Sequence, residues 1–262
     1  MSNLNDQNWQ LPKFTVEEFR KRKTKYCLCI PVINEGERIR KQLFKTKKYA
    51  KLIDILILDG GSTDDSLDKS FLKEMAVRTL LTKTSPGRQS TQLRMGFSYA
   101  LREGYEGIIT IDGNGKDGVE AIPAFIKQLD RGFDYIQGSR FMKGGKAINT
   151  PPLRWLGIRF LISPFLSIAS GYWFSDITNG FRAYSKRVLL SPKVKLFRDL
   201  FIKYELLFYL PVKAAQLGFK VTELPVSRAY PKHEIPTKIK SVTGHLDFLV
   251  TVIKTAFGTY NP

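Results

Sequence analysis

Two short polar motifs in this chain carry side chains that suit metal and phosphate chemistry. Asp112-Gly113-Asn114 follows the apolar run 108–111, and Asp59-Gly60-Gly61-Ser62 follows the run 53–58. A carboxylate and an amide two residues apart at a strand end are able to direct oxygens at one divalent cation. Mg²⁺ and Mn²⁺ prefer such hard ligands and commonly share them with phosphates. Taken alone, each motif is more often a turn or a helix cap than a metal site.

The surrounding pattern predicts strands and helices that alternate through the first two-thirds of the chain. Strands are expected over 26–33, 53–58, 78–81, 107–111 and 133–137. Helices are expected over 34–49, from 62 onward, over 89–102 and over 119–129, with Asn34 and Ser62 as N-caps. This order predicts an α/β fold with a mainly parallel central sheet flanked by helices. Ligands bind outside the carboxyl ends of such strands, so the polar motifs are expected on one rim.

Composition limits the partners. The 262 residues suit one large domain, and 42 Lys and Arg against 24 Asp and Glu give a net charge of +18. That charge favours nucleic acid, an anionic membrane face or phosphorylated substrates as partners. Cys27 and Cys29 lie two apart in an apolar run, which is poor spacing for a disulfide. We therefore expect reduced core thiols and a cytoplasmic protein.

Two apolar segments are candidates for membrane contact. The run 160–174 has no charge but falls short of the roughly 20 apolar residues of a spanning helix, and Pro164 interrupts it. The segment 246–257 has apolar residues at helical spacing. For both segments the sequence leaves open whether they pack on lipid or on the protein core. The start of the chain is a poor signal peptide. No hydrophobic tail of spanning length follows the expected catalytic domain, so any membrane contact is expected to be peripheral or through a partner.

Five motifs occur in an order and spacing that resemble a known family. They are Pro31-Val-Ile-Asn-Glu35, Asp59-Gly-Gly-Ser-Thr-Asp64, Asp112-Gly-Asn114, Gly138-Ser-Arg140 and Asp176-Ile-Thr-Asn-Gly-Phe-Arg182. Together they resemble family 2 glycosyltransferases of the GT-A fold, and most closely the dolichol- and polyprenyl-phosphate sugar transferases. The resemblance covers roughly 25–236, most of the chain. We therefore expect a polar, basic N-terminal extension over 1–24, a catalytic domain over 25–236, and a basic, amphipathic tail over 237–262.

The resemblance implies sugar transfer, with inversion, from a nucleotide-sugar donor (a UDP- or GDP-sugar) to a lipid-linked acceptor such as polyprenyl phosphate. The place implied is the anionic cytoplasmic face of a membrane. The implied donor-binding residues are Pro31, Asn34, Glu35, Asp59, Gly61, Ser62, Asp112, Gly113, Asn114 and Lys116. Asp112 and Asn114 would hold Mg²⁺ or Mn²⁺, and Arg140, Arg159 and Ser163 would contact the acceptor phosphate. The catalytic candidates are Asp112, Arg140, Asp176 and Glu205. Asp176 or Glu205 would be the base for a hydroxyl acceptor, whereas a phosphate acceptor needs none.

Three positions depart from the family pattern. Asn114 stands where a second carboxylate is common, and Lys116 stands where another metal ligand is often found. A neutral amide lowers metal affinity, and Lys116 is able to supply positive charge to a diphosphate instead. Gly60 stands where a second Asp is frequent, which leaves the identity of the nucleotide open.

Other functions are compatible with parts of the sequence. A transferase that acts on a hydroxyl of a growing glycan keeps the class and changes the acceptor. A nucleic-acid-binding protein would suit the net charge, but the positive residues are scattered and no nucleic-acid module is recognisable. A nucleotidyltransferase usually has a glycine-rich phosphate loop near its start, which 31–37 is not. The basic segment 228–238 resembles a flexible lid over phosphates, or it is a solvated loop.

Overall fold

The computed structural model describes residues 6–231 and 242–262, and its core is one eight-stranded sheet. The strand order is β1-β4-β3-β2-β5-β8-β6-β9. These strands are β1 Phe14–Glu18, β2 Tyr26–Val32, β3 Asp54–Asp59, β4 Val77–Lys83, β5 Gly107–Thr110, β6 Tyr135–Ser139, β8 Arg182–Ser185 and β9 Val221–Pro225. Two short strands, β7 Lys146–Ile148 and β10 Ser227–Ala229, pair in parallel beside them. Of the main-sheet strands in the described residues, only β1 and β8 run antiparallel to their neighbours, so the predicted mainly parallel α/β sheet is confirmed.

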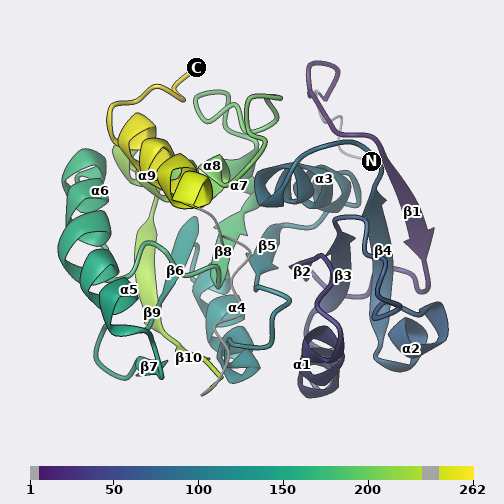
Figure 1. Ribbon diagram of the computed structural model, residues 1–262. Helices are drawn as coiled ribbons and strands as arrows, with labels where there is room; N and C mark the ends of the chain where they lie inside the picture. Colours follow the sequence, from purple (N-terminus) through teal and green to yellow (C-terminus); the bar gives the residue numbers. More distant parts are fainter. Residues whose placement is uncertain (1–5, 232–241) are drawn as a thin grey trace.

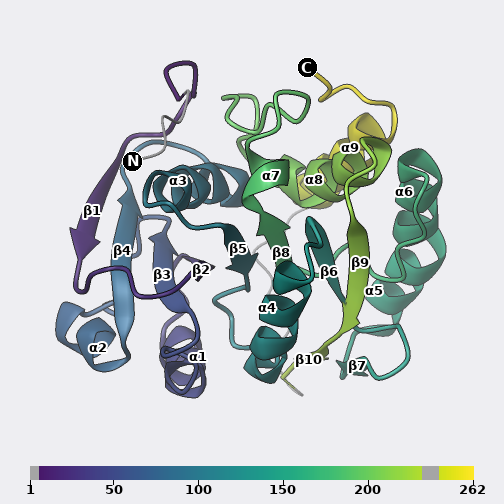
Figure 2. The same cartoon turned by 180° about the vertical axis from the view of Figure 1, so that it is seen from behind.

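Helices cover both faces of this sheet (Figures 1 and 2). One apolar cluster contains side chains of α1 Glu37–Lys47, α2 Lys69–Glu74 and α4 Ile122–Asp130, and these helices lie below the sheet in Figure 1. The other contains side chains of α3 Gln89–Arg102, α6 Ser163–Ser170, α8 Glu205–Gln216 and α9 Val242–Ala256. The shorter helices are α5 Pro152–Leu156 and α7 Lys186–Leu189, with the 3₁₀ turn η1 Val119–Ala121 and the π-helical turn η2 Gly157–Ile162.

The central strands are apolar on both sides because helices cover both faces. All six residues of β3 are buried, which is typical of a parallel strand in the middle of an α/β sheet. Along β2, Cys27 and Cys29 face the α3 cluster, whereas Leu28 and Ile30 face the α1 cluster. Both thiols are free and buried, as predicted, and burial raises the pKa of Cys27.

The prediction that Asn34 and Ser62 are helix N-caps is wrong. α1 begins at Glu37 and α2 begins at Lys69, so neither side chain lies at a helix start. Instead, Asn34 Oδ1 accepts a hydrogen bond from the Thr63 N–H, and Ser62 Oγ accepts one from the Asn34 N–H. Short polar side chains bond loops as readily as helix ends, and local sequence does not distinguish the two.

Both ends of the described chain pack on the main body. Phe14–Glu18, within the predicted N-terminal extension, adds β1 to the edge of the sheet beside β4. In α9, Phe248 packs edge to face against Phe208 of α8, with ring centres 5.0 Å apart. The predicted boundary at 236/237 and most of the basic segment 228–238 fall outside the described residues. The domain boundaries therefore stay predictions.

α5, η2 and α6 join into one helical segment, Pro152–Ser170, at the margin of the molecule (Figure 1). Within the described residues it is the one helix whose length and composition would allow it to cross a membrane. Core helices of soluble proteins also meet these two criteria. Only 28% of its apolar window is buried. It extends further toward the N-terminus than the uncharged run 160–174 and includes Arg154 and Arg159.

Candidate active site

Short polar contacts connect the loops that follow β2 and β3. Asp59, at the end of β3, accepts hydrogen bonds from the Ser62 N–H (2.8 Å) and from the Ser62 hydroxyl (2.7 Å). Ser62 Oγ also accepts from the Asn34 N–H at 3.1 Å, and Asn34 Oδ1 accepts from the Thr63 N–H at 2.8 Å. Three predicted donor-binding residues, Asn34, Asp59 and Ser62, therefore belong to one network.

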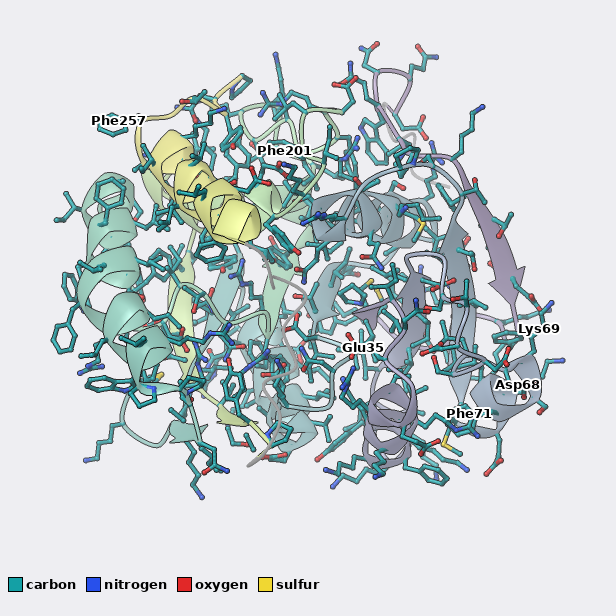
Figure 3. The ribbon with its side chains drawn as sticks, viewed as in Figure 1. Glu35, Asp68, Lys69, Phe71, Phe201 and Phe257 are labelled. Carbon is teal, nitrogen blue, oxygen red and sulfur yellow. The ribbon has the colours of Figure 1, made fainter. Side chains whose placement is uncertain are left out.

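Four further predicted donor residues, Pro31, Glu35, Gly61 and Gly113, lie in or against the same loops. Glu35, near the start of α1 in Figure 3, accepts from Arg38 Nε at 3.0 Å. Gly61 has a φ of 94°, which favours glycine. Gly113 packs against β2: its N–H lies 3.3 Å from the Pro31 carbonyl, and a Cβ at this position would lie 2.9 Å from the same oxygen. Glycine thus allows the motif after β5 to approach the end of β2 closely.

Asp112 is surrounded by hydrogen-bond donors. Its Oδ2 accepts from Arg228 Nη2 at 2.9 Å, and its Oδ1 accepts from Gln89 Nε2 at 3.3 Å. Asn114 Nδ2 lies 3.5 Å from Oδ2. Gly180, from the motif 176–182, makes room for this carboxylate, because a Cβ there would lie 2.5 Å from Oδ1. The structure thus brings the third and fifth motifs into contact.

Arg228 connects two carboxylates on this rim. Besides Asp112, its guanidinium donates to both oxygens of Asp117, at 2.6 and 2.5 Å. The backbones are also paired, since the Ala229 N–H donates to the Lys116 carbonyl at 2.8 Å. Burial alone would raise the pKa of Asp112, but the positive charges of Arg228 and Lys116 outweigh it and lower that pKa.

Tyr230 lies among several positive side chains. Lys116 Nζ is 4.8 Å from the centre of its ring, and the guanidinium carbons of Arg154 and Arg228 are 5.6 and 5.9 Å from it. Arg154 Nη1 also donates to the phenol oxygen at 3.2 Å. Burial opposes ionisation of the phenol, but Arg228, Arg140 and Arg154 outweigh it and lower the pKa of Tyr230 to about 8. Burial and the charge of Arg228 lower the pKa of Lys116 to about 8 as well.

Arg140 and Asp176 form a buried ion pair. Nε and Nη2 of Arg140 donate to the two Asp176 oxygens at 2.6 and 2.8 Å, and the Arg140 N–H donates to Oδ2 at 3.1 Å. Asp176 is 0% exposed and Arg140 is 4% exposed. Asp176 would have to leave Arg140 before it took a proton from an acceptor hydroxyl. Its assignment as a base stays a prediction, and the geometry makes it the partner that holds Arg140.

Two further side chains, the partly buried Glu223 and the fully buried Arg182, hold the segment that contains Asp176. Glu223 on β9 accepts from the N–H (3.0 Å) and the hydroxyl (2.8 Å) of Ser175. Burial raises the pKa of Glu223, although these hydrogen bonds favour its ionised form. Arg182 is fully buried and donates to the carbonyls of Asn179, Ile177 and Leu207. The segment is therefore tied to both β9 and α8.

A pocket of about 300 Å³ lies beside this segment. It is lined by Phe141, Arg159, Phe160, Ser163, Pro164, Trp173, Phe174 and Ser175. The structure thus places the predicted acceptor residues Arg159 and Ser163 in one pocket. The guanidinium carbons of Arg159 and Arg140 lie 5.9 and 5.0 Å from the centre of the Phe141 ring. Ser163 Oγ accepts from the Ile177 N–H at 3.3 Å, next to Asp176 in the chain.

Glu205 begins α8 and is 7% exposed. Its Oε2 accepts from the Lys203 N–H at 2.7 Å. The next residue, Leu206, donates its N–H to Ser90 Oγ at 3.1 Å, and Ser90 follows the Gln89 that contacts Asp112. The start of α8 thus lies against the start of α3, and the role of Glu205 as a base stays a prediction.

The side chains at Asp112 fit a divalent cation poorly. They offer one carboxylate and one amide, and the described part of the chain has no group of three or more His, Cys, Asp or Glu that could hold a metal. Arg228 already bonds Asp112 Oδ2 and both oxygens of Asp117. Mg²⁺ and Mn²⁺ are commonly held by one or two protein carboxylates together with phosphate and water oxygens, and here the carboxylates are already bonded to Arg228. A Mg²⁺ or Mn²⁺ site at Asp112 and Asn114 therefore stays a prediction for this chain.

Four residues of this site were not singled out from the sequence: Gln89, Asp117, Glu223 and Tyr230. Asp117 carried a signal, because it is a carboxylate directly after a motif that already contained Asp112 and Lys116. Tyr230 also carried one, because it lies in the basic segment 228–238. Gln89 and Glu223 carried none, since their partners lie far away in the chain.

Relatives of known function share this chain's sequence pattern. The model of Glycosyl transferase family 2 matches residues 27–190. Polyprenol monophosphomannose synthase of Mycolicibacterium smegmatis is 28% identical over 201 residues, which cover 76% of this chain and 75% of that protein. Undecaprenyl-phosphate mannosyltransferase of Micrococcus luteus is 27% identical over 201 residues, which cover 76% of this chain and 81% of that protein.

A solved structure shares the fold. Glucosyl-3-phosphoglycerate synthase from Mycobacterium tuberculosis, in complex with Mn²⁺ and UDP-glucose, superposes with a TM-score of 0.63 at 15% identity and covers 89% of this chain and 78% of that one. This likeness concerns the fold alone and confirms the predicted GT-A architecture. The family model spans well over half of the chain, and the two curated relatives are polyprenyl-phosphate sugar transferases, as the five motifs predicted. This chain is a glycosyltransferase that belongs to glycosyl transferase family 2.

Proposed function

We propose that this enzyme transfers a sugar, with inversion, from a nucleotide-sugar to a polyprenyl phosphate at a membrane surface. One observation carries the proposal: the pocket that contains Arg159 and Ser163 is walled by the largely exposed apolar helix Pro152–Ser170. A lipid phosphate needs positive groups for its phosphate and an apolar path for its chain, and this pocket offers both. The names of the two curated relatives support the same acceptor class.

The donor is assigned to the rim formed by the loops after β2, β3 and β5. We place its diphosphate beside Asp112 and Lys116, where positive side chains gather around Tyr230. We place its nucleoside on the network that joins the loops after β2 and β3. The donor-binding set is Pro31, Asn34, Glu35, Asp59, Gly61, Ser62, Asp112, Gly113, Asn114 and Lys116.

The reaction then needs no general base. A phosphate oxygen of the acceptor attacks the anomeric carbon from the side opposite the diphosphate. The bond between that carbon and the diphosphate breaks, and its electron pair leaves on the diphosphate. Arg159 and Ser163 orient the acceptor phosphate, and Arg140, held by Asp176, adds positive charge beside it.

The exposed apolar surface supports membrane docking. α9 buries Val252 and packs Phe248 on α8, so it partly covers the core. α6 and α9 are in contact, and together they present many exposed apolar side chains near the margin where Figure 3 labels Phe257. The exposed set on and around these helices is Leu153, Leu156, Phe160, Leu161, Phe165, Ile168, Trp173, Leu246, Leu249, Val250, Ile253 and Phe257. Apolar surface of this extent on a chain with a net charge of +18 suits an anionic bilayer.

To test this proposal, the full chain is incubated with a panel of UDP-, GDP-, CDP- and dTDP-sugars and with undecaprenyl phosphate in detergent. Release of nucleoside diphosphate and formation of a glycosylated lipid are measured. We expect one donor to support both, Asp112→Ala to abolish them, and the exposed control Lys127→Gln to retain them. Donor binding without a lipid product would contradict the acceptor and favour a hydroxyl of a growing glycan. Failure of every nucleotide-sugar to bind would contradict the donor class.

A further inference from the structure

In the part of the chain that the structure describes, two positive side chains lie next to two carboxylates at this rim. Asp112 and Asp117 carry two negative charges, and Lys116 and Arg228 carry two positive charges, so these four groups sum to zero. The guanidinium of Arg182 adds further positive charge, which helps to lower the pKa of Asp112. Lys116 is 7% exposed and Arg228 is 6% exposed, so both positive charges are built into the protein beside the rim.

Both positive side chains are anchored from several directions. Arg228 bonds two carboxylates through three hydrogen bonds of 2.5–2.9 Å. Lys116 belongs to a segment that pairs with β10, through its own carbonyl and through the bridge between Asp117 and Arg228. Its ammonium group also lies 4.8 Å from the centre of the Tyr230 ring. Groups fixed before the ligand arrives need little reorganisation during a reaction.

Among the described residues, the same contacts leave few ligands for a metal. Arg228 engages both oxygens of Asp117 and one oxygen of Asp112, and Gln89 bonds the second oxygen of Asp112. A divalent cation bound there would have to displace Arg228 and would meet the charge of Lys116. The displaced guanidinium of Arg228 would be left buried without its carboxylates, which opposes that exchange.

We propose that Lys116 and Arg228 take the charge-neutralising place of a divalent cation, so that this enzyme binds its donor and transfers the sugar without a metal. The inference rests on the proposed function. When the bond from the anomeric carbon to the diphosphate oxygen breaks, the electron pair goes to the diphosphate, and the acceptor phosphate oxygen forms the new bond. Lys116 and Arg228 donate hydrogen bonds to the departing diphosphate and balance its charge.

The first experiment measures binding of UDP and GDP to the chelator-treated full chain by calorimetry, with EDTA or with Mn²⁺. We expect the Kd in EDTA to lie within about threefold of the Kd in Mn²⁺. We expect Lys116→Gln to weaken binding in EDTA about tenfold, as loss of a charge-assisted hydrogen bond should. Lys127→Gln, an exposed lysine on α4, is the matched control, and thermal unfolding checks that each variant is folded.

A second variant restores the ligands that the family pattern would supply. We expect Asn114→Asp combined with Lys116→Gln to bind Mn²⁺, seen as loss of the free-ion signal in electron paramagnetic resonance, and to bind nucleotide only with Mn²⁺. The original chain with UDP should leave that signal unchanged. Nucleotide binding by the original chain only in Mn²⁺ would overturn this inference and leave the proposed function intact. If no nucleotide bound in either condition, the proposed donor would fail, and this inference with it.

Discussion

The donor side and the acceptor side of this site are held together by different means. On the donor side, contacts between backbone and small side chains join the loops, as between Asp59 and Ser62 or where Gly113 meets Pro31. The ion pairs of Arg228 with Asp112 and Asp117 lie beside these loops. On the acceptor side, the segment 175–182 is held by buried charges, above all the pair of Arg140 and Asp176. The donor side should therefore be sensitive to added volume as well as to the loss of a charge, whereas the acceptor side should be sensitive chiefly to the loss of a charge.

The largest effect is expected from Asp176→Asn on the acceptor side. The change leaves Arg140 buried without its carboxylate, and breaking such a pair costs about 3–5 kcal/mol of unfolding free energy. Urea denaturation measures the loss, with Glu74→Gln at an exposed position of α2 as the control. A loss no greater than that of the control would mean that the acceptor side does not depend on this charge pair.

The next effect concerns volume beside Asp112. Gly180→Ala places a Cβ 2.5 Å from Asp112 Oδ1, so the carboxylate must move. Because small misplacements in an active site are costly, we expect turnover to fall about 100-fold with little change in unfolding free energy. Gly157→Ala is the control, since a Cβ there meets nothing within 4 Å. Equal turnover in the two variants would contradict the close fit that we assign to the donor side.

A smaller effect is expected at the exposed apolar surface that adjoins the acceptor pocket. Leu153→Asp combined with Ile168→Asp changes side chains that are 85% and 80% exposed, so the fold should persist. Loss of their burial in lipid should weaken binding to vesicles that contain anionic lipid by tenfold or more, as about 1.5–3 kcal/mol per side chain implies. Co-sedimentation measures this, with Leu52→Asp, at 52% exposure, as the control. Equal vesicle binding by the double variant and the control would contradict a membrane role for this surface.

The two sides also differ in how well the sequence predicted them. The donor side follows from short motifs at strand ends, and the predicted helix 89–102 agrees with α3 at both ends. The contacts that complete the site are long-range: Arg228 and Asp112 are 116 residues apart in the chain. Nothing local distinguishes an arginine that bonds a buried carboxylate from one on a solvated loop. The exposure of Leu249 and Ile253 on α9 was not predictable either. Helical spacing shows that apolar residues share a face of a helix, but it does not show whether that face packs on the protein core.

The smallest effect concerns Tyr230, where the two sides meet. Lys116 and Arg228 approach its ring from the donor side, Arg154 bonds its hydroxyl, and Arg140 adds charge from the acceptor side. Its pKa is lowered from the ordinary value of 10 to about 8, so the folded state favours the phenolate. The resulting stability is fully present above the unfolded pKa and is lost as the pH falls through about 8. We expect the phenolate absorbance to rise as the pH passes through about 8, because Tyr230 ionises there. Tyr230→Phe should lack this transition.

The effect of nucleotide on this titration tests whether the two sides share their positive charge. A bound diphosphate adds negative charge beside Lys116 and Arg228, and nearby negative charge disfavours a phenolate. We therefore expect UDP or GDP to raise the pKa of Tyr230 toward its ordinary value, measured by the same absorbance. The difference in unfolding free energy between the original chain and Tyr230→Phe should rise with pH. This rise should be less steep when nucleotide is present. An unchanged titration in a chain that binds nucleotide would mean that the diphosphate lies away from the cluster around Tyr230, and that donor and acceptor charges act separately.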